Sequence, residues 1–230
     1  MKRVERPSPN QDERGGAAVD MLVLHYTGMT SGAAALARLC DPAARVSAHY
    51  TIDEDGTVYA MVPETRRAWH AGISHWAGAR DINARSIGIE LVNPGHEFAY
   101  RAFAEAQIAA LIPLCQDIVK RHAIPSWRVL GHSDVAPARK EDPGELFPWK
   151  RLADAGIGLW PAPGTDPGAE AVAALLTRYG YDPEAPPEKI VTAFQRHFRP
   201  SRVDGMADAE TRAMLSGLLA LYDAQKGKRA

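Results

Sequence analysis

The chain lacks the features of a disulfide-rich, nucleic-acid-binding or membrane-spanning protein. It has two cysteines in 230 residues, Cys40 and Cys115, and neither lies in a short Cys/His cluster, which argues against a disulfide framework or a cysteine zinc site. The formal net charge of −1 argues against a broad electrostatic surface for nucleic acid or an anionic membrane. No apolar run is long enough to span a bilayer.

The N-terminal segment, residues 1–16, reads MKRVERPSPNQDERGG and lacks the apolar core of a signal peptide. We therefore expect a cytoplasmic protein on the sequence as given. If a signal has been removed from the chain, we expect a periplasmic one instead.

Strands and helices alternate along the first two thirds of the chain. Short apolar runs predict buried strands at 21–26, 86–92 and 127–130, and a hairpin is expected around Glu54-Asp55-Gly56, between 47–53 and 57–62. Helical patterns cover 31–40, 99–122 and 149–155. After an irregular arm at 1–20, this order predicts an α/β fold with a mixed central sheet flanked by helices.

A Pro/Gly-rich segment divides the chain near residue 160. We expect a catalytic domain with its N-terminal arm at 1–156, a linker at 157–167 and a small helical domain at 168–230. Three helical patterns in this last part, at about 168–179, 187–197 and 208–223, predict a three-helix domain.

Two stretches of the sequence together suggest a zinc site. MLVLHYTG ends an apolar run in His25, and GHSDVAPARKEDPG, residues 131–144, follows another apolar run and contains His132 and Asp142. Asp142 lies ten residues after His132, so one loop can return its carboxylate to the metal. A catalytic zinc commonly has three protein ligands and one open position, which these three residues could supply.

Two further residues would complete a hydrolytic site. Glu90 ends the segment SIGIE, and a carboxylate in a partly dry cleft can accept a proton and later donate it. Lys140 could stabilise the oxyanion of a tetrahedral intermediate. Such a centre suits amide hydrolysis. The alternatives for these residues are a histidine packed in the sheet and solvated surface charges.

The ordered segments VLHYT, RVSAHY, RAWHAG, SIGIE and GHSDVAPARKEDPG resemble the zinc-dependent N-acetylmuramoyl-L-alanine amidase family over roughly residues 19–155. The resemblance implies the fold shared with peptidoglycan recognition proteins and one Zn²⁺ ion per chain. It makes His25, His132 and Asp142 the implied ligands, and Glu90 and Lys140 match the catalytic positions of the family. The implied reaction cleaves the amide between the lactyl group of N-acetylmuramic acid and L-alanine.

The resemblance also indicates partners for the chain. Muropeptide or peptidoglycan is the implied substrate, and we expect neither nucleic acid nor an obligate protein partner. The segment AFQRHFRPSRVDGMADAETRAML is similar to small helical peptidoglycan-binding domains. Tyr26 differs from the small polar amide often found there in the recycling branch, so the sequence leaves open a soluble anhydromuropeptide or the sacculus.

Three residues are weaker candidates for substrate contacts. Arg45 could hold a stem-peptide carboxylate through a bidentate contact, and Trp69 and His70 lie in an aromatic loop expected to border the cleft. For Trp69 and His70, packing in the core is the alternative. A peptidoglycan-binding protein without catalysis and a different zinc peptidase are the alternative functions.

Overall fold

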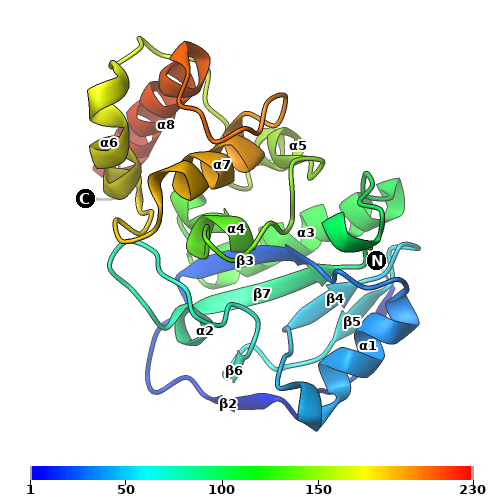
Figure 1. Ribbon diagram of the computed structural model, residues 1–230. Coiled ribbons are helices and arrows are strands. Elements are labelled where there is room, and N and C mark those ends of the chain that lie inside the picture. The colour runs from blue at the N-terminus through cyan, green and yellow to red at the C-terminus, as the bar shows by residue number, and fades with distance from the viewer. Residues whose placement is uncertain (1, 229–230) are drawn as a thin grey trace.

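The centre of the molecule is a six-stranded mixed sheet (Figure 1). The structure is a computed structural model and describes residues 2–228. The strands lie in the order β1 (Arg3–Glu5), β5 (Val58–Ala60), β4 (Tyr50–Ile52), β7 (Ser86–Leu91), β3 (Met21–Tyr26) and β8 (Val129–Gly131). Only the β4–β5 hairpin is antiparallel within this sheet. The predicted mixed sheet is confirmed.

The N-terminal arm is more regular than expected. β1 pairs with β5 at the sheet edge, and β2 (Gln11–Glu13) pairs with β6 (Arg66–Ala68) in a second, two-stranded sheet. Each of these strands has three residues, so hydrogen bonds to a partner distant in sequence stabilise it rather than a local pattern. The prediction of an irregular arm was therefore wrong for these two segments.

Eight α-helices surround the sheet within the described residues. They are α1 (Gly32–Cys40), α2 (Ile82–Arg85), α3 (Glu105–Arg121), α4 (His132–Val135), α5 (Trp149–Asp154), α6 (Val172–Tyr179), α7 (Pro187–Phe198) and α8 (Ala209–Gly227). Ser31 caps α1 by accepting a hydrogen bond from the Ala34 amide. Helix α3 begins later than predicted and runs through Pro113 without interruption. None of these helices is long and apolar enough to cross a membrane.

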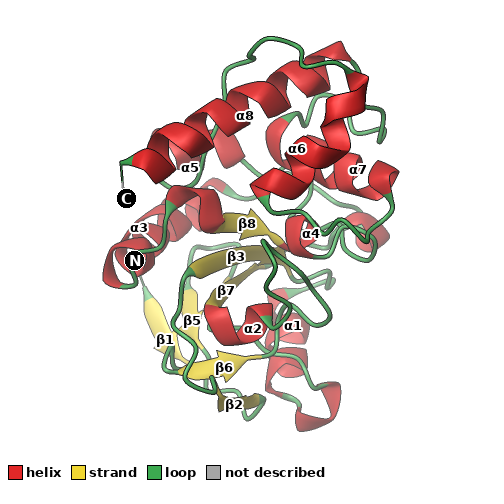
Figure 2. Cartoon of the chain, turned by 90° about the vertical axis from the view of Figure 1, so that its left-hand side faces the viewer, coloured by secondary structure: helices red, strands yellow, loops and turns green. Residues whose placement is uncertain are grey.

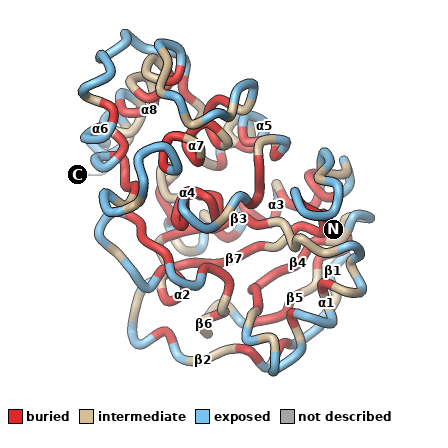
Figure 3. The backbone as a smooth tube through the Cα atoms, in the orientation of Figure 1, coloured by how far each residue is buried: buried red, intermediate tan, exposed pale blue. Residues whose placement is uncertain are grey.

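The two faces of the sheet belong to different hydrophobic clusters. Because side chains alternate along a strand, Leu22 and Leu24 point to one face and Met21 and Val23 to the other. The first pair packs in the cluster that contains α3 and α5. The second pair packs in the cluster that contains α6, α7 and α8. Figure 2 shows α3 and the C-terminal helices around the sheet, and Figure 3 shows the buried course of its central strands.

The C-terminal helices lie where the sequence placed them, and they share a core with the sheet. Their buried residues Phe194, Phe198 and Leu215 belong to the same cluster as Met21 and Val23. Within 157–167, the segment expected to be a linker, Ile157 and Leu159 are buried, one in each cluster.

Candidate metal centre

Two predicted site residues lie side by side at the carboxyl ends of parallel strands. His25 on β3 is paired in register with Glu90 on β7. Neighbours in register on adjacent strands point to the same face of a sheet. Both side chains therefore project from the face that carries Met21 and Val23, near the C-terminal helices rather than near α3.

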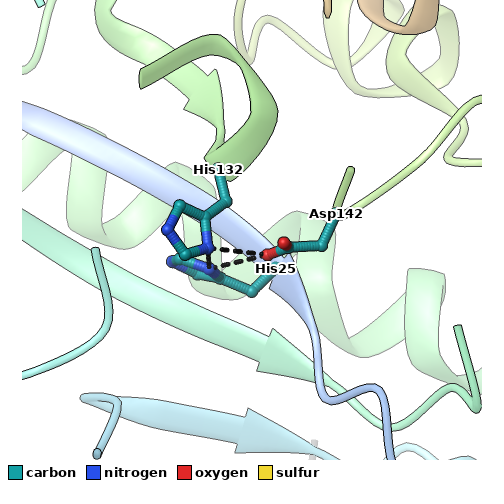
Figure 4. A group of neighbouring side chains, drawn as sticks. All are labelled: His25, His132 and Asp142. Carbon is teal, nitrogen blue, oxygen red and sulfur yellow. Dashed lines mark hydrogen bonds and ion pairs between the residues drawn. The ribbon is translucent and has the colours of Figure 1, made fainter. Parts of the chain in front are cut away.

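His132 and Asp142 reach His25 from the end of β8. His132 is the first residue of α4, directly after β8, and the chain then turns back to bring in Asp142 (Figure 4). His25 Nδ1, His132 Nδ1 and Asp142 Oδ2 lie 3.0 Å from one another in all three pairs. All three residues are buried. The ligand set predicted from the sequence is thus brought together in space.

The far nitrogen of each histidine ring is engaged outside the cluster. His132 Nε2 lies 3.0 Å from the carbonyl oxygen of Ala71. A carbonyl oxygen only accepts hydrogen bonds, so His132 carries its proton on Nε2. Its Nδ1 is then a bare acceptor that faces the other two ligand atoms.

A longer chain of hydrogen bonds fixes the proton on His25. Ser86 Oγ donates to the carbonyl oxygen of Ile82 at 2.6 Å, so it accepts from His70 Nε2 at 3.1 Å. His70 Nδ1 is left as an acceptor, and it receives the His25 Nε2 proton at 3.0 Å. His25 therefore also presents a bare Nδ1 to the cluster.

The donor chemistry of this cluster fits a cation. Two imidazole nitrogens and one carboxylate oxygen converge as acceptors, and the tautomers leave no proton between them. Burial, and then the neighbouring His132, lower the pKa of His25 to about 4, so its ring is neutral near pH 7. Two neutral imidazoles and one carboxylate are a donor set that zinc accepts in catalytic sites.

The carboxylate of Asp142 is ionised. Burial alone would raise its pKa, but its position against His132 and then His25 outweighs burial and holds the pKa well below its ordinary value. An ionised carboxylate is the form that binds a metal.

The Glu90 carboxyl group differs from that of Asp142. Burial, and then the charge of Asp142, raise the pKa of Glu90 well above its ordinary value, although Lys140 opposes the shift. Its Oε2 is buried and has no hydrogen-bond partner among residues 2–228. A carboxyl group with a raised pKa and a free oxygen can both accept and donate a proton.

A cleft of about 540 Å³ opens over these groups. Glu90, Lys140 and Asp142 line it, as do two of the three weaker candidates, Trp69 and His70. Arg45, the third, is exposed and does not line the cleft, although Val46 and Ser47 beside it do. The cleft gives a substrate access to His132 and Asp142 and to both predicted catalytic residues.

The residues that support the predicted ligands were not predicted in that role from the sequence. Ser86, Gly88 and Glu90 share one face of β7, and a Cβ atom at Gly88 would lie 2.4 Å from His70 Cγ. Gly88 thus leaves room for the His70 ring beneath His25. The alternation in SIGIE, apolar on one face and Ser, Gly, Glu on the other, is the signal that could have identified this arrangement.

Comparison with known proteins agrees with this geometry. The sequence model of the N-acetylmuramoyl-L-alanine amidase family matches residues 15–145. The chain is 42% identical over 233 aligned positions to N-acetylmuramoyl-L-alanine amidase AmiD of Escherichia coli strain K12, an alignment that covers 89% of this chain and 83% of AmiD.

Two solved structures have a similar fold. One is AmiD from E. coli in complex with the substrate anhydro-N-acetylmuramic acid-L-Ala-D-gamma-Glu-L-Lys, with a TM-score of 0.81, 41% identity, and coverage of 90% of this chain and 92% of that one. The other is AmpDh3 from Pseudomonas aeruginosa in complex with anhydromuramic pentapeptide, with a TM-score of 0.82, 35% identity, and coverage of 94% and 96%. The fold, the ligand cluster and these matches together show that the chain belongs to the N-acetylmuramoyl-L-alanine amidase family.

Proposed function

We propose that this amidase uses one Zn²⁺ ion, held by His25, His132 and Asp142, to hydrolyse the amide between the lactyl group of anhydro-N-acetylmuramic acid and L-alanine. One observation carries the zinc assignment. Three buried acceptor atoms converge within 3.0 Å of one another while the histidine protons point outward. Two imidazole lone pairs and a carboxylate charge buried this close together are unfavourable, and a bound cation would compensate for them.

Zinc supplies the Lewis acidity of the reaction. When bound, it polarises the scissile carbonyl and lowers the pKa of water. The outward hydrogen bonds of His25 and His132 keep both rings oriented toward the ion. Asp142 contributes the one negative charge of the ligand set.

Glu90 would carry the proton. In this proposal its carboxylate removes a proton from the attacking water and then passes that proton to the departing nitrogen of L-alanine. Its raised pKa suits both steps, because the group must gain and lose a proton at the same pH. Lys140, in the same cleft, would stabilise the negative oxygen of the tetrahedral intermediate.

The substrate form is inferred from the relatives. The AmiD and AmpDh3 complexes contain anhydromuramic peptides. We infer that the cleft of this chain accepts soluble anhydromuropeptides, as part of peptidoglycan turnover or recycling. Trp69 and His70 at the cleft wall, and Arg45 near it, remain proposed substrate contacts.

The domain organisation and the location also belong to this proposal. We assign residues 1–156 to catalysis, 157–167 to the connection and 168–230 to a helical domain of the peptidoglycan-binding type. The cytoplasmic location expected from the sequence stays a prediction, which fractionation of the native host would check.

Product analysis tests the proposal. The purified chain is incubated with an anhydromuramyl tetrapeptide and, separately, with intact sacculi, each with and without a chelator. We expect free tetrapeptide beginning with L-alanine, released faster from the soluble substrate and lost with the chelator. Cleavage within the peptide would indicate a different zinc peptidase, and binding without any release would indicate a non-catalytic protein.

A further inference from the structure

We propose that the C-terminal helices position the metal ligands, because they hold the segment 132–142 near both of its ends. This inference rests on the proposed metal site. The two attachment points are Asp134, two residues after His132, and Glu141, one residue before Asp142. In Figure 1, α7 lies beside α4, the short helix that begins with His132.

Asp134 is a buried carboxylate that accepts hydrogen bonds both from its own segment and from the C-terminal part of the chain. Its Oδ2 accepts from the Gly131 amide at 2.7 Å, which fixes the start of α4. The same oxygen accepts from His197 Nδ1 on α7 at 2.7 Å, and Oδ1 accepts from the Tyr181 hydroxyl at 2.7 Å. Thus two of the hydrogen bonds to Asp134 come from residues beyond 168.

The two donors from the C-terminal part are themselves fixed by packing. The His197 ring stacks on Trp149 at a centroid distance of 3.7 Å. The Tyr181 ring packs edge-on against Trp76 at 5.0 Å. Tyr181 and His197 are 1% and 2% exposed, so neither can turn to water instead of Asp134.

The second attachment point lies next to Asp142. Arg196 on α7 donates to Glu141 Oε1 at 2.8 Å. Successive residues of α7, Arg196 and His197, therefore bind the two ends of the ligand-bearing segment. Between these ends, the Ser133 amide donates to the Asp142 carbonyl oxygen at 2.9 Å, which couples α4 directly to the second ligand.

Loss of a hydrogen-bond donor to Asp134 should change the affinity of the site for zinc. A buried carboxylate with an unsatisfied oxygen moves toward water or toward another donor. Asp134 is hydrogen-bonded to the residue that precedes His132, so such a movement would change the orientation of the His132 ring. Outer contacts of this kind typically alter metal affinity about 10- to 100-fold.

The test compares Tyr181→Phe with Tyr179→Phe in the full-length chain. Tyr181→Phe removes only the hydroxyl that donates to Asp134. Tyr179 is 2% exposed and lies in the same aromatic cluster, but the hydrogen bonds to the Asp134 carboxylate come from Gly131, Tyr181 and His197. Zinc affinity is measured by chelator competition well below the unfolding temperature, and the absorption spectrum of the Co²⁺-substituted protein reports ligand geometry.

We expect Tyr181→Phe to bind zinc about 10-fold more weakly and to change the Co²⁺ spectrum, while Tyr179→Phe matches the wild type. Wild-type affinity and spectrum in Tyr181→Phe would overturn the positioning role. Equal loss in both variants would also overturn it, because the effect would then be general destabilisation. Failure of the wild type to bind zinc would instead overturn the proposed function.

A second pair of variants applies if Tyr181→Phe does not fold. Arg196→Met removes the contact with Glu141, and Arg178→Met removes an ion pair with Asp223 that lies wholly within the C-terminal part. Weaker zinc binding is expected only in Arg196→Met. Equal zinc affinities in these two variants would contradict the second attachment point.

Discussion

At the scale of single residues, the position of the proton on His25 is determined by a chain of hydrogen bonds that begins outside the ligand cluster. The carbonyl of Ile82 orients the Ser86 hydroxyl, which fixes the tautomer of His70 and through it that of His25. His70 was a candidate substrate contact in the sequence, and it does border the cleft. Its hydrogen bonds favour a structural role toward the metal as well.

Replacing His70 tests this chain of hydrogen bonds. We expect His70→Leu to weaken zinc binding about 10-fold or more, because the His25 Nε2 proton loses its acceptor. His70→Asn keeps an acceptor near the position of Nδ1 and should lose less. Chelator competition measures both effects.

His49 provides the control for this experiment. It is a buried histidine 5.8 Å from the His70 ring, and its hydrogen bonds go to Gly88, Arg14 and Arg66 rather than to His25. His49→Asn should leave zinc affinity unchanged. A loss as large as that in His70→Leu would show that any lost imidazole in this region has the same effect.

The three residues of the candidate metal site could be predicted from the sequence, but the residues that support them could not. His25, His132 and Asp142 stand in ordered motifs of the family, and the structure brings them together. Their supports act through contacts between the loop that carries His70 and the face of β7 that carries Ser86 and Gly88. The alternation in SIGIE indicates that Ser86 and Gly88 share a face of the strand, but no local pattern indicates which loop crosses that face.

At the scale of elements, the segments with a strong local pattern were predicted well. The strand at 21–26 matches β3, and the helix at 31–40 matches α1 with Ser31 as its cap. β1, β2 and α4 were missed because each has three or four residues. Such elements depend on tertiary partners, here β5, β6 and the C-terminal helices.

One partly buried carboxylate, that of Glu64, connects several elements away from the proposed metal site. Glu64, in the turn before β6, accepts hydrogen bonds from Arg121, from His122 at 2.6 Å and from Tyr50 at 2.6 Å. Burial would raise its pKa, but these contacts outweigh burial and lower the pKa from 4.5 to about 2. They tie the end of α3 to β4.

The lowered pKa predicts how stability depends on pH. The folded state binds this proton more weakly than the unfolded state, so the contribution is complete above pH 4.5 and is lost as the pH falls toward 2. Glu64→Gln should lower the free energy of unfolding by about 2 kcal/mol at pH 7 and by much less at pH 3. Urea denaturation at both pH values measures this, and a difference independent of pH would contradict it.

At the scale of the whole molecule, the C-terminal helices complete the core of the catalytic part. Met21, Val23 and Leu130 on the sheet pack in one cluster with Phe194 and Phe198. A Pro/Gly-rich segment in the sequence indicates where one part of a chain gives way to another. It does not indicate whether the two parts share buried surface, which depends on apolar faces that meet only after folding.

Removal of residues 158–230 tests this dependence. The truncated chain exposes the sheet face around Met21 and Val23, at about 2 kcal/mol for each large side chain uncovered. It also leaves Asp134 without Tyr181 and His197. We expect a loss of several kcal/mol in the free energy of unfolding, measured by urea denaturation. A truncated chain that unfolds at the same urea concentration as the full chain would contradict a shared core.

Zinc content measured beside turnover tests most directly whether metal binding and proton transfer are the work of different residues. The proteins compared are the wild type, Asp142→Ala and Glu90→Gln, with an anhydromuramyl peptide as substrate. We predict that Asp142→Ala loses both zinc and turnover. Glu90→Gln should retain one zinc per chain while turnover falls about 100-fold or more. Equal zinc loss in both variants, or full turnover in Glu90→Gln, would contradict the account.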